Sequence, residues 1–445
     1  KTNMLLKKMI PLADRAGIVP ARLLASTAQA ANVLSYSQIL SSSLPSRFDT
    51  YADQRPVPIC LKDLVNAGRG NKIGLSLLAE GTRETQSESF ENEVLLQNAK
   101  FLHHELQVRF ARAIRKLDEM PLLGDMPSVS TVRRRYWQSF SDLGDFPHPS
   151  TVEEERAFAQ LTATIAQRHS DTMIYMARGV LEWRRSRLER RLSRTLDCPV
   201  KEDPTLAKHG AVLDRFLAQR IGLRLLLAQH NELHSCNIMP TYTGIVCLNT
   251  CLGRLLEYAI SDAEEVCIRH FQGQVPRVEI EGINPDGLVF PYIPEHLHYM
   301  LFELLKNAMR ATVERHSTGQ TWCEVGPPIK IKVSMSPDSQ SMVLTISDQG
   351  DGIPKENLEH IWRYMFTTAS SLAQDTLMAS SDALEQSTPL AGLGYGLPLS
   401  RLYARYFGGD LRIVSKEGEG VDAMIMLRQD QTSSYWSWEH EHAER

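Results

Sequence analysis

The sequence lacks long apolar stretches, has few cysteines and carries no excess of positive charge. No uninterrupted apolar run approaches the ~18 residues of a membrane-spanning helix, so no such span is expected. The 7 cysteines are odd in number and scattered, which argues against a disulfide framework and for a reducing compartment. The formal net charge is -4, so electrostatics give no reason to expect a nucleic-acid partner.

Basic residues are concentrated at the N-terminal end. Asp14 is the only acidic residue within 1–47, a stretch that is also rich in Ser and Ala. Such a composition is typical of the tail of a mitochondrial presequence or of the region just after one. An ordinary basic arm remains the alternative. Because the polar stretch 79–93 resembles an insertion, we expect residues 1–94 to form an N-terminal arm and insertion.

Helical periodicity follows up to about residue 235. Apolar residues recur at intervals of three and four, the spacing of one helical face. They include Leu102, Leu106, Phe110, Ile114 and Leu117. Segments rich in Pro, Gly and Asp separate the periodic stretches. The pattern predicts a bundle of about four long helices as a domain over 95–240.

After residue 240 the pattern mixes helices with strands. Strand patterns at 329–335, 343–347, 411–415 and 421–427 accompany helical patterns near 252–259 and 295–315. This order predicts an α/β sandwich over 241–428, with helices on one side of a sheet, and then a tail at 429–445. The predicted fold class of the chain is α+β, with the four-helix-bundle-like domain first.

A first candidate site lies on the helix predicted at 296–314. Its polar face carries Glu303, Asn307, Arg310 and Glu314, opposite an apolar stripe. Asn is a poor helix former, so a solvated face does not explain its place in mid-helix. An Asn amide oxygen is a suitable ligand for Mg²⁺. A carboxylate one turn earlier can activate a water or hydroxyl beside the same phosphate.

A second candidate is SerAspGlnGlyAspGlyIlePro at 347–354, directly after a predicted strand. Asp348 can accept a hydrogen bond from an adenine amino group. Gly350 and Gly352 allow the backbone to approach the base and to adopt unusual φ values. Taken alone, the motif also fits a simple strand-to-loop turn.

A third candidate is the glycine loop at 392–396, which precedes a predicted helix. Backbone N–H groups of such a loop, with a helix N-terminus behind it, are suited to phosphate binding. The stretch 367–391 before it has little pattern and fits a nucleotide lid. Each signal is weak alone, but the three in this order predict an ATP site.

The three motifs together resemble those of a known family. Glu-x-x-x-Asn, Asp-x-Gly-x-Gly and Gly-x-Gly-x-Gly are similar to the GHKL (Bergerat) ATP-binding fold of histidine kinases, Hsp90, MutL and type II topoisomerases. More closely, 306–314, 364–369 and 388–404 resemble the mitochondrial pyruvate dehydrogenase kinase and branched-chain 2-oxoacid dehydrogenase kinase family. Residues 105–109 and 168–171 resemble the helical domain of that family, so the resemblance covers about 95–428.

The resemblance implies a protein serine kinase of the mitochondrial matrix that uses Mg-ATP to phosphorylate and inactivate the E1 component of the pyruvate dehydrogenase complex. Glu303 would be the general base toward the serine hydroxyl, Asn307 the Mg²⁺ ligand and Asp348 the adenine acceptor. The implied ATP-binding residues are Asn307, Arg310, Asp348, Gly350, Gly352, Thr368, Gly392, Leu393, Gly394, Tyr395, Gly396 and Leu397. Further implied are K⁺, an E1 α subunit as substrate, the lipoyl domain of the E2 core as partner, and a homodimer.

The resemblance also implies a regulatory pocket in the helical domain. Ile165, His169, Arg220 and Arg224 match the positions that line the family's allosteric 2-oxoacid pocket. Two arginines near a histidine are suited to a small carboxylate. Surface or interhelical charges are the alternative reading of these residues.

Two positions depart from the family pattern. Many pyruvate dehydrogenase kinases have His four residues before the base, where this chain has Tyr299, as in the branched-chain enzyme. His298 is one residue away and should point about 100° elsewhere around the helix. Val421 stands where the family has Thr. Because the side chain of Val cannot hydrogen-bond, we expect weaker or water-assisted recognition of the adenine.

Several alternatives remain at this stage. Residues 276–280 and 290–294 resemble the branched-chain enzyme, whereas 388–404 resemble the pyruvate one. An ATPase clamp would need a transducer domain after the ATP fold. A histidine kinase would need a phosphoacceptor, and His103 and His104 lie in unsuitable surroundings. A non-catalytic regulatory subunit would explain Tyr299 and Val421, but not the intact set of acidic and amide residues.

Overall fold

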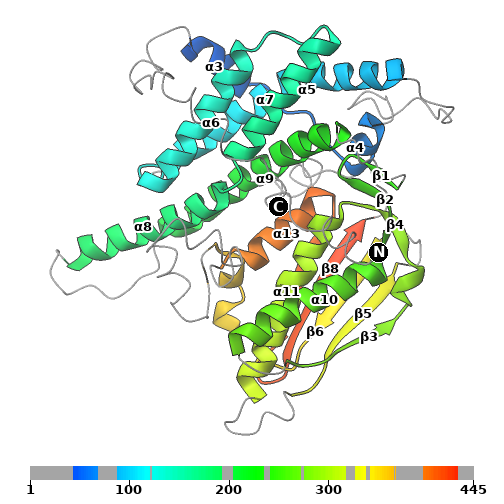
Figure 1. The fold of residues 1–445 in the computed structure, drawn as a ribbon. Coiled ribbons are helices and arrows are strands. Elements are labelled where there is room, and N and C mark those ends of the chain that lie inside the picture. The colour runs from blue at the N-terminus through cyan, green and yellow to red at the C-terminus, as the bar shows by residue number, and fades with distance from the viewer. Residues whose placement is uncertain are drawn as a thin grey trace.

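The computed structural model describes residues 44–68, 88–120, 123–192, 204–234, 241–271, 275–316, 326–336, 341–364, 366 and 394–428. A helical domain forms the upper half of Figure 1, and a sheet with helices in front of it forms the lower half. The predicted α+β class, with the helical part first, is confirmed. None of the described helices is long and apolar enough to cross a membrane.

The helical domain is built around one central helix, α5. Its long helices are α5 (Glu88–Asp118), α6 (Pro127–Asp145), α7 (Val152–Arg168), α8 (Thr172–Leu192) and α9 (Pro204–Leu233). α5 packs against α6, α7 and α9, while α8 packs on α6 and extends away from the bundle (Figure 1). The predicted apolar stripe from Leu102 to Leu117 is fully buried in the core. The described residues thus contain one long helix more than the four predicted.

The N-terminal boundary of this domain was placed too late by the sequence pattern. α5 begins at Glu88, so the end of the predicted insertion is helical. Before it, α3 (Leu44–Ala52) and α4 (Leu61–Ala67) contribute Ala52 and Leu64 to the helical core. Short helices with few apolar residues give little periodic signal, which is why the sequence pattern does not separate 44–68 from the arm. Residues 1–43 and 69–87 lie outside the described residues.

The second domain contains a five-stranded sheet in the order β3-β5-β6-β8-β7. The strands are β3 (Val278–Gly282), β5 (Ile329–Met335), β6 (Ser341–Ser347), β7 (Asp410–Lys416) and β8 (Gly420–Arg428). β3 and β5 are parallel, and the other neighbours are antiparallel. The alternating residues Ala423, Ile425 and Leu427 of β8 are buried, as the period of two predicted.

Helices cover the buried face of this sheet. They are α10 (Leu252–Phe271), α11 (Pro294–His316) and α13 (Gly396–Tyr406), which lie in front of the strands in Figure 1. Short 3-10 turns lie at Pro285–Gly287, Lys355–Asn357 and His360–Trp362. α11 packs between α10 and α13, so its two flanks face different neighbours. This arrangement confirms the predicted sandwich with helices on one side.

A small antiparallel sheet that the sequence pattern did not reveal joins the two domains. It consists of β1 (Tyr242–Thr243), β2 (Val246–Cys251) and β4 (Val289–Tyr292). Gln229 of α9 fastens it, because its Nε2 donates to the carbonyls of Leu64 and Thr243 and its Oε1 accepts from the Ile245 N–H. Strands of two to six residues are too short for a clear period.

Arg109 of α5 makes a buried polar contact between the domains. Its Nε donates to Glu105 Oε1 over 2.7 Å, and its Nη2 donates to the Val57 carbonyl over 2.6 Å. It also hydrogen-bonds the Tyr406 hydroxyl of α13. Gly222 of α9 makes room for this contact, since a Cβ there would collide with Arg109 and lie 2.7 Å from Tyr406 Oη.

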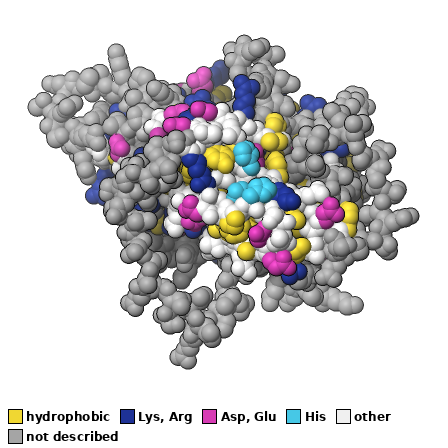
Figure 2. Space-filling view, turned by 90° about the horizontal axis from the view of Figure 1, so that it is seen from above, with side chains coloured by type: hydrophobic (Ala, Val, Ile, Leu, Met, Phe, Trp, Pro, Cys, Tyr) yellow, Lys and Arg dark blue, Asp and Glu magenta, His cyan; other side chains and the backbone are white. Residues whose placement is uncertain are grey.

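The outer face of the helical domain has no single sign of charge. Seen from above, its described surface shows acidic and basic side chains interspersed with histidines and small apolar patches (Figure 2).

Candidate active site

Glu303 of α11 is buried against the start of α13. Only 4% of it is exposed. A Cβ added at Gly396, the first residue of α13, would collide with Glu303 Oε2, so only glycine allows this approach. The other carboxylate oxygen, Oε1, accepts a hydrogen bond from Lys306 Nζ over 2.7 Å. One oxygen is therefore fixed by a cation while the other faces a helix N-terminus.

The next polar residues of α11 continue along the same side. Asn307 is half-buried one turn after Glu303. Arg310 lies one further turn along, with its Nε 3.5 Å from Glu314 Oε1. Burial raises the pKa of the Cys267 thiol on α10 to about 11, and the charges of Lys306 and Arg310 oppose that rise. Arg310 is thus close to α10, at the rim of the face that carries Glu303.

The loop after β6 is held against α11 by its backbone. Arg315 Nη1 donates to the Gly350 carbonyl over 2.7 Å, and a Cβ at Gly350 would lie 2.7 Å from Ala311 Cβ. Gly352 has φ +75, and a Cβ there would lie 2.5 Å from the Lys416 carbonyl oxygen. Both glycines are therefore required for the loop to fit between α11 and the β7–β8 turn.

Asp348 begins this loop with its carboxyl partly enclosed. Its Oδ1 accepts from the Gly350 N–H over 2.9 Å. Burial, above all, and the nearby Asp422 raise the pKa of Asp348 to about 6. The Asp348 N–H donates to the carbonyl of Val421 over 2.9 Å. The backbone at 421 therefore positions Asp348, and this contact does not depend on the side chain that differs from the family.

The glycine loop leads directly into α13. Gly394 has φ +72, which disfavours other residues. The ring of Tyr395 is fully buried, with its centroid 5.2 Å from that of Tyr364, so its backbone rather than its ring is turned toward the site. Leu397 packs against the core. Thr368, Gly392 and Leu393 lie outside the described residues, as does the predicted lid at 367–391.

The N-terminus of α13 is suited to an anion. Within the described residues no side chain caps it, and its first turn has no acidic residue. The first N–H groups of a helix have no partner inside the helix, and the helix dipole favours negative charge there. Gly396 contacts α11 at Glu303 and Gly350 contacts it at Ala311, so both loop motifs pack on the helix that carries the first motif. Their donors and acceptors fit a nucleotide: Asp348 for the base, α13 for phosphates and the Asn307 oxygen for Mg²⁺.

Tyr299, in place of the family's His, is half-buried and lies one turn before Glu303 on α11. Burial, followed by the charge of Glu303, raises the pKa of its phenol well above the usual range. Its hydroxyl finds no hydrogen-bond partner among the described residues. His298 Nε2 instead lies 2.9 Å from Asp262 Oδ2 of α10. The prediction that His298 points away from the base is confirmed.

The sequence patterns did not reveal a row of rings beside Glu303. The rings of His296 and Tyr403 have centroids 4.4 Å apart, and those of Tyr299 and Tyr403 are 5.4 Å apart. Burial and the charge of Arg224 lower the pKa of His296 to about 3, so its imidazole is neutral. The row thus runs from Arg224 of α9 to Glu303. The spacing 296, 299, 303 along one helical face was the available signal.

The four residues predicted to line a 2-oxoacid pocket include a buried cation. Ile165 is fully buried near the end of α7, and His169 Nε2 lies 2.9 Å from Ser139 Oγ. Arg220 is 4% exposed, and its Nε and Nη2 find no hydrogen-bond partner among the described residues. Burial and then the charge of Arg224 lower the pKa of Arg220 to about 10. Arg224 itself is exposed. A buried guanidinium with free donors favours an anion site over a surface charge at Arg220.

Comparisons with known proteins match both domains. Residues 61–247 match the family described as mitochondrial branched-chain alpha-ketoacid dehydrogenase kinase. Residues 292–431 match the histidine kinase-, DNA gyrase B-, and HSP90-like ATPases. The mitochondrial pyruvate dehydrogenase (acetyl-transferring) kinase of Arabidopsis thaliana is 37% identical over 75% of this chain and 85% of its own length. Isozyme 1 of the same kinase from Rattus norvegicus is 31% identical over 88% of this chain and 82% of its own length. Isozyme 3 from Homo sapiens is 31% identical over 89% of this chain and 89% of its own length.

The sheet, its covering helices and the three motifs define the second domain as an ATP-binding domain of the GHKL class. Taken with the matched helical domain and the relatives, this chain belongs to the mitochondrial pyruvate dehydrogenase kinase and branched-chain 2-oxoacid dehydrogenase kinase family.

Proposed function

We propose that this chain is a protein serine kinase that transfers the γ-phosphate of ATP to the E1 component of the pyruvate dehydrogenase complex and so inactivates it. The names of its relatives, which it matches over most of their length, support this activity and a mitochondrial location. The observation that carries the proposal is Glu303, a buried carboxylate with one oxygen held by Lys306 and the other beside Gly396.

The proposed chemistry divides the site among its elements. Glu303 Oε2 accepts the proton of the serine hydroxyl while the hydroxyl oxygen attacks the γ-phosphorus, whose bond to the β,γ-bridging oxygen breaks and releases ADP. The N–H groups at the start of α13 hold phosphate oxygens, and Asp348 accepts from the adenine amino group. Asn307 would hold Mg²⁺, which when bound neutralises phosphate charge. Burial of Glu303 keeps bulk water from the carboxylate, which favours a serine hydroxyl over water as the nucleophile.

Family resemblance supports the remaining parts of the proposal. We place the chain in the mitochondrial matrix, as a homodimer that binds the lipoyl domain of the E2 core, with the E1 α subunit as substrate. K⁺ would be a further cation near the nucleotide. Arg310 and the loop residues Gly394, Tyr395 and Leu397 would contact ATP, the last two through their backbone.

The test of the function is phosphate transfer from labelled Mg-ATP to purified E1. Pyruvate E1 and branched-chain E1 are compared in parallel, because the helical domain matches the family that carries the branched-chain name. We expect label on serine of pyruvate E1, together with loss of its dehydrogenase activity. Label on the branched-chain E1 alone would move the substrate to that enzyme, and label on neither would overturn the proposal.

Replacing Asp348 with Asn is expected to weaken ATP binding by about 10- to 100-fold near neutral pH, the cost of a hydrogen bond to a charged acceptor. Because the pKa of Asp348 is about 6, the carboxylate acceptor is present above that pH and lost below it. Affinity of the unmodified protein should therefore fall as pH drops through about 6, while the variant's affinity changes less. Titration calorimetry at several pH values measures both. Asp422→Asn is the matched control, and equal losses in both variants would contradict the assignment.

Replacing Arg220 with Met is expected to stabilise the protein and abolish binding of small 2-oxoacids. A buried cation without full hydrogen bonding costs stability, and apolar replacements of buried charges often gain about 1–4 kcal/mol. Thermal unfolding with and without pyruvate measures both effects. Arg215→Met, at an exposed position of the same helix, is the control and should change neither. A destabilised variant that still binds pyruvate would contradict the pocket.

A further inference from the structure

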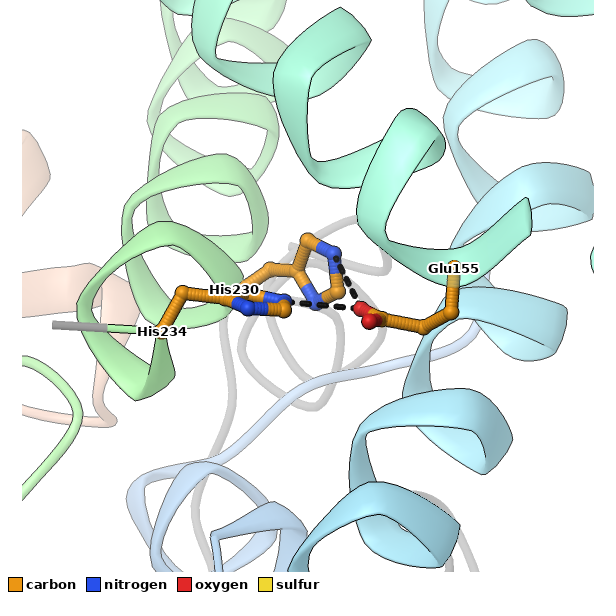
Figure 3. Close-up of side chains that lie close together, drawn as sticks. All are labelled: Glu155, His230 and His234. Carbon is orange, nitrogen blue, oxygen red and sulfur yellow. Dashed lines mark hydrogen bonds and ion pairs between the residues drawn. The ribbon is translucent and has the colours of Figure 1, made fainter. Parts of the chain in front are cut away.

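Three side chains from two helices of the helical domain point toward one another (Figure 3). Glu155 lies in the first turn of α7, His230 lies in the last turn of α9, and His234 directly follows that helix. Their ligand atoms are all within 4.8 Å of one another. Glu155 Oε1 is 2.7 Å from His234 Nε2 and 3.6 Å from His230 Nε2. The kinase chemistry proposed above uses none of the three.

His230 is the member of the cluster that lacks an ordinary explanation. Its side chain is 1% exposed, yet neither ring nitrogen has a hydrogen-bond partner among the described residues. Buried imidazoles normally satisfy at least one nitrogen. A neutral imidazole turned toward a carboxylate is the form in which His binds metal ions.

The geometry of the cluster fits a small divalent ion. Residues four apart on a helix share a face, so His230 and His234 present their rings together. With Zn–N and Zn–O bonds of about 2.0–2.2 Å, the ligand atoms of a tetrahedral site lie roughly 3.3 Å apart. The 3.6 Å distance between His230 Nε2 and Glu155 Oε1 is already close to this value. The 2.7 Å distance between His234 Nε2 and Glu155 Oε1 would have to widen by about 0.6 Å.

Neighbouring residues hold Glu155 and His230 in place, and the side of the cluster at His234 is open to solvent. The Thr151 side chain caps α7 by accepting from the Glu154 N–H, which fixes the turn that carries Glu155. The ring of Phe158 lies 5.8 Å from that of His230 and forms an apolar wall. The His234 side chain is 24% exposed, so the cluster reaches solvent on that side. Three protein ligands with an open side would leave a fourth position for water.

We propose that Glu155, His230 and His234 form a binding site for a divalent transition metal, with Zn²⁺ the ion that suits two imidazoles and one carboxylate best. Mg²⁺ and Ca²⁺ prefer all-oxygen ligands and should not compete. The bound ion would fasten the first turn of α7 to the last turn of α9. These are the two helices that carry Ile165 and Arg220 at other points of their length, and His169 directly follows α7. The site would therefore stiffen the frame of the proposed 2-oxoacid pocket from one end.

The full chain, freed of metal with a chelator, is titrated with Zn²⁺ and with Co²⁺ in the presence of excess Mg²⁺. We expect one Zn²⁺ per chain, a visible Co²⁺ absorption typical of tetrahedral coordination, and a higher thermal midpoint with Zn²⁺. His234→Gln, at the partly exposed position, should raise the dissociation constant at least ~100-fold, beyond what loss of a supporting partner costs at metal sites. Glu155→Gln should do the same.

His104→Gln is the control, because this exposed imidazole on α5 is hydrogen-bonded to Gln54 Oε1 and lies outside the cluster. It should bind Zn²⁺ like the unmodified chain. Equal Zn²⁺ affinity in the control and the His234 variant would overturn the site. So would the lack of stoichiometric Zn²⁺ binding by the unmodified chain, which would identify the cluster as a hydrogen-bonded contact alone. The Co²⁺ spectrum of the unmodified chain tests the proposal without reliance on any variant's folding.

Discussion

Replacing Glu303 with Gln is expected to slow phosphate transfer to E1 by about 10²- to 10⁴-fold, the usual contribution of a positioned general base. The amide keeps the size of the carboxylate but cannot accept the serine proton. ATP binding should be nearly unchanged, because Asp348 and the start of α13 hold the nucleotide in the proposed arrangement. Single-turnover transfer of labelled phosphate measures the rate, and calorimetry measures the nucleotide affinity.

The structure supplies a matched control for this variant on the same helix. Glu314 lies three turns after Glu303, with 55% of its side chain exposed, so Glu314→Gln should leave the transfer rate unchanged. A second comparison is Lys306→Met, which frees Glu303 Oε1. It should lower the rate less than Glu303→Gln, because the base remains present but less well fixed. Full activity in Glu303→Gln would remove Glu303 from the role of base.

The sequence alone predicted the parts of the fold whose signal is periodic or local. The strands around Asp348 and the helix that carries Glu303 and Asn307 lie where the patterns placed them. Such signals depend on residues close in the chain, and the glycine positions depend on local backbone conformation. The fold class and the order of the three motifs followed from these features.

What the sequence could not predict depends on contacts between distant segments. The sequence pattern of α11 predicts a polar face that is solvated or ligand-binding, but Glu303 is buried because α13, almost a hundred residues later, begins beside it. Tyr395 belongs to a phosphate-loop motif, yet its ring is buried against Tyr364. The Glu155–His234 contact joins residues 79 apart, and neither residue has a distinctive neighbourhood in the sequence. Spacing within one segment carries no information about such pairs.

Replacing Arg109 with Met is expected to lower the free energy of unfolding by about 3–5 kcal/mol, because it leaves a buried carboxylate without its cation. Glu105 and Arg109 are 2% and 1% exposed and 2.7 Å apart. Burial already raises the pKa of Glu105, and the charge of Arg109 is the main opposing effect. The variant also removes the contact with Tyr406 across the domain interface. Urea unfolding followed by circular dichroism and by tryptophan fluorescence measures the loss.

Three comparisons distinguish the effect of leaving the Glu105 charge unpaired from the effect of losing the packing of the Arg109 side chain. Arg133→Met breaks an exposed pair with Asp118, so it should cost no more than about 1 kcal/mol. The double variant Glu105→Gln with Arg109→Met removes both charges and should recover much of the lost stability. The pKa of the Glu105 carboxyl is raised in the folded protein and should rise further without Arg109, so folding takes up a proton there. The loss of unfolding free energy in Arg109→Met should therefore shrink as pH falls. A deficit that is independent of pH and unrelieved in the double variant would mean that packing, and not the unpaired charge of Glu105, sets the role of Arg109 at the interface.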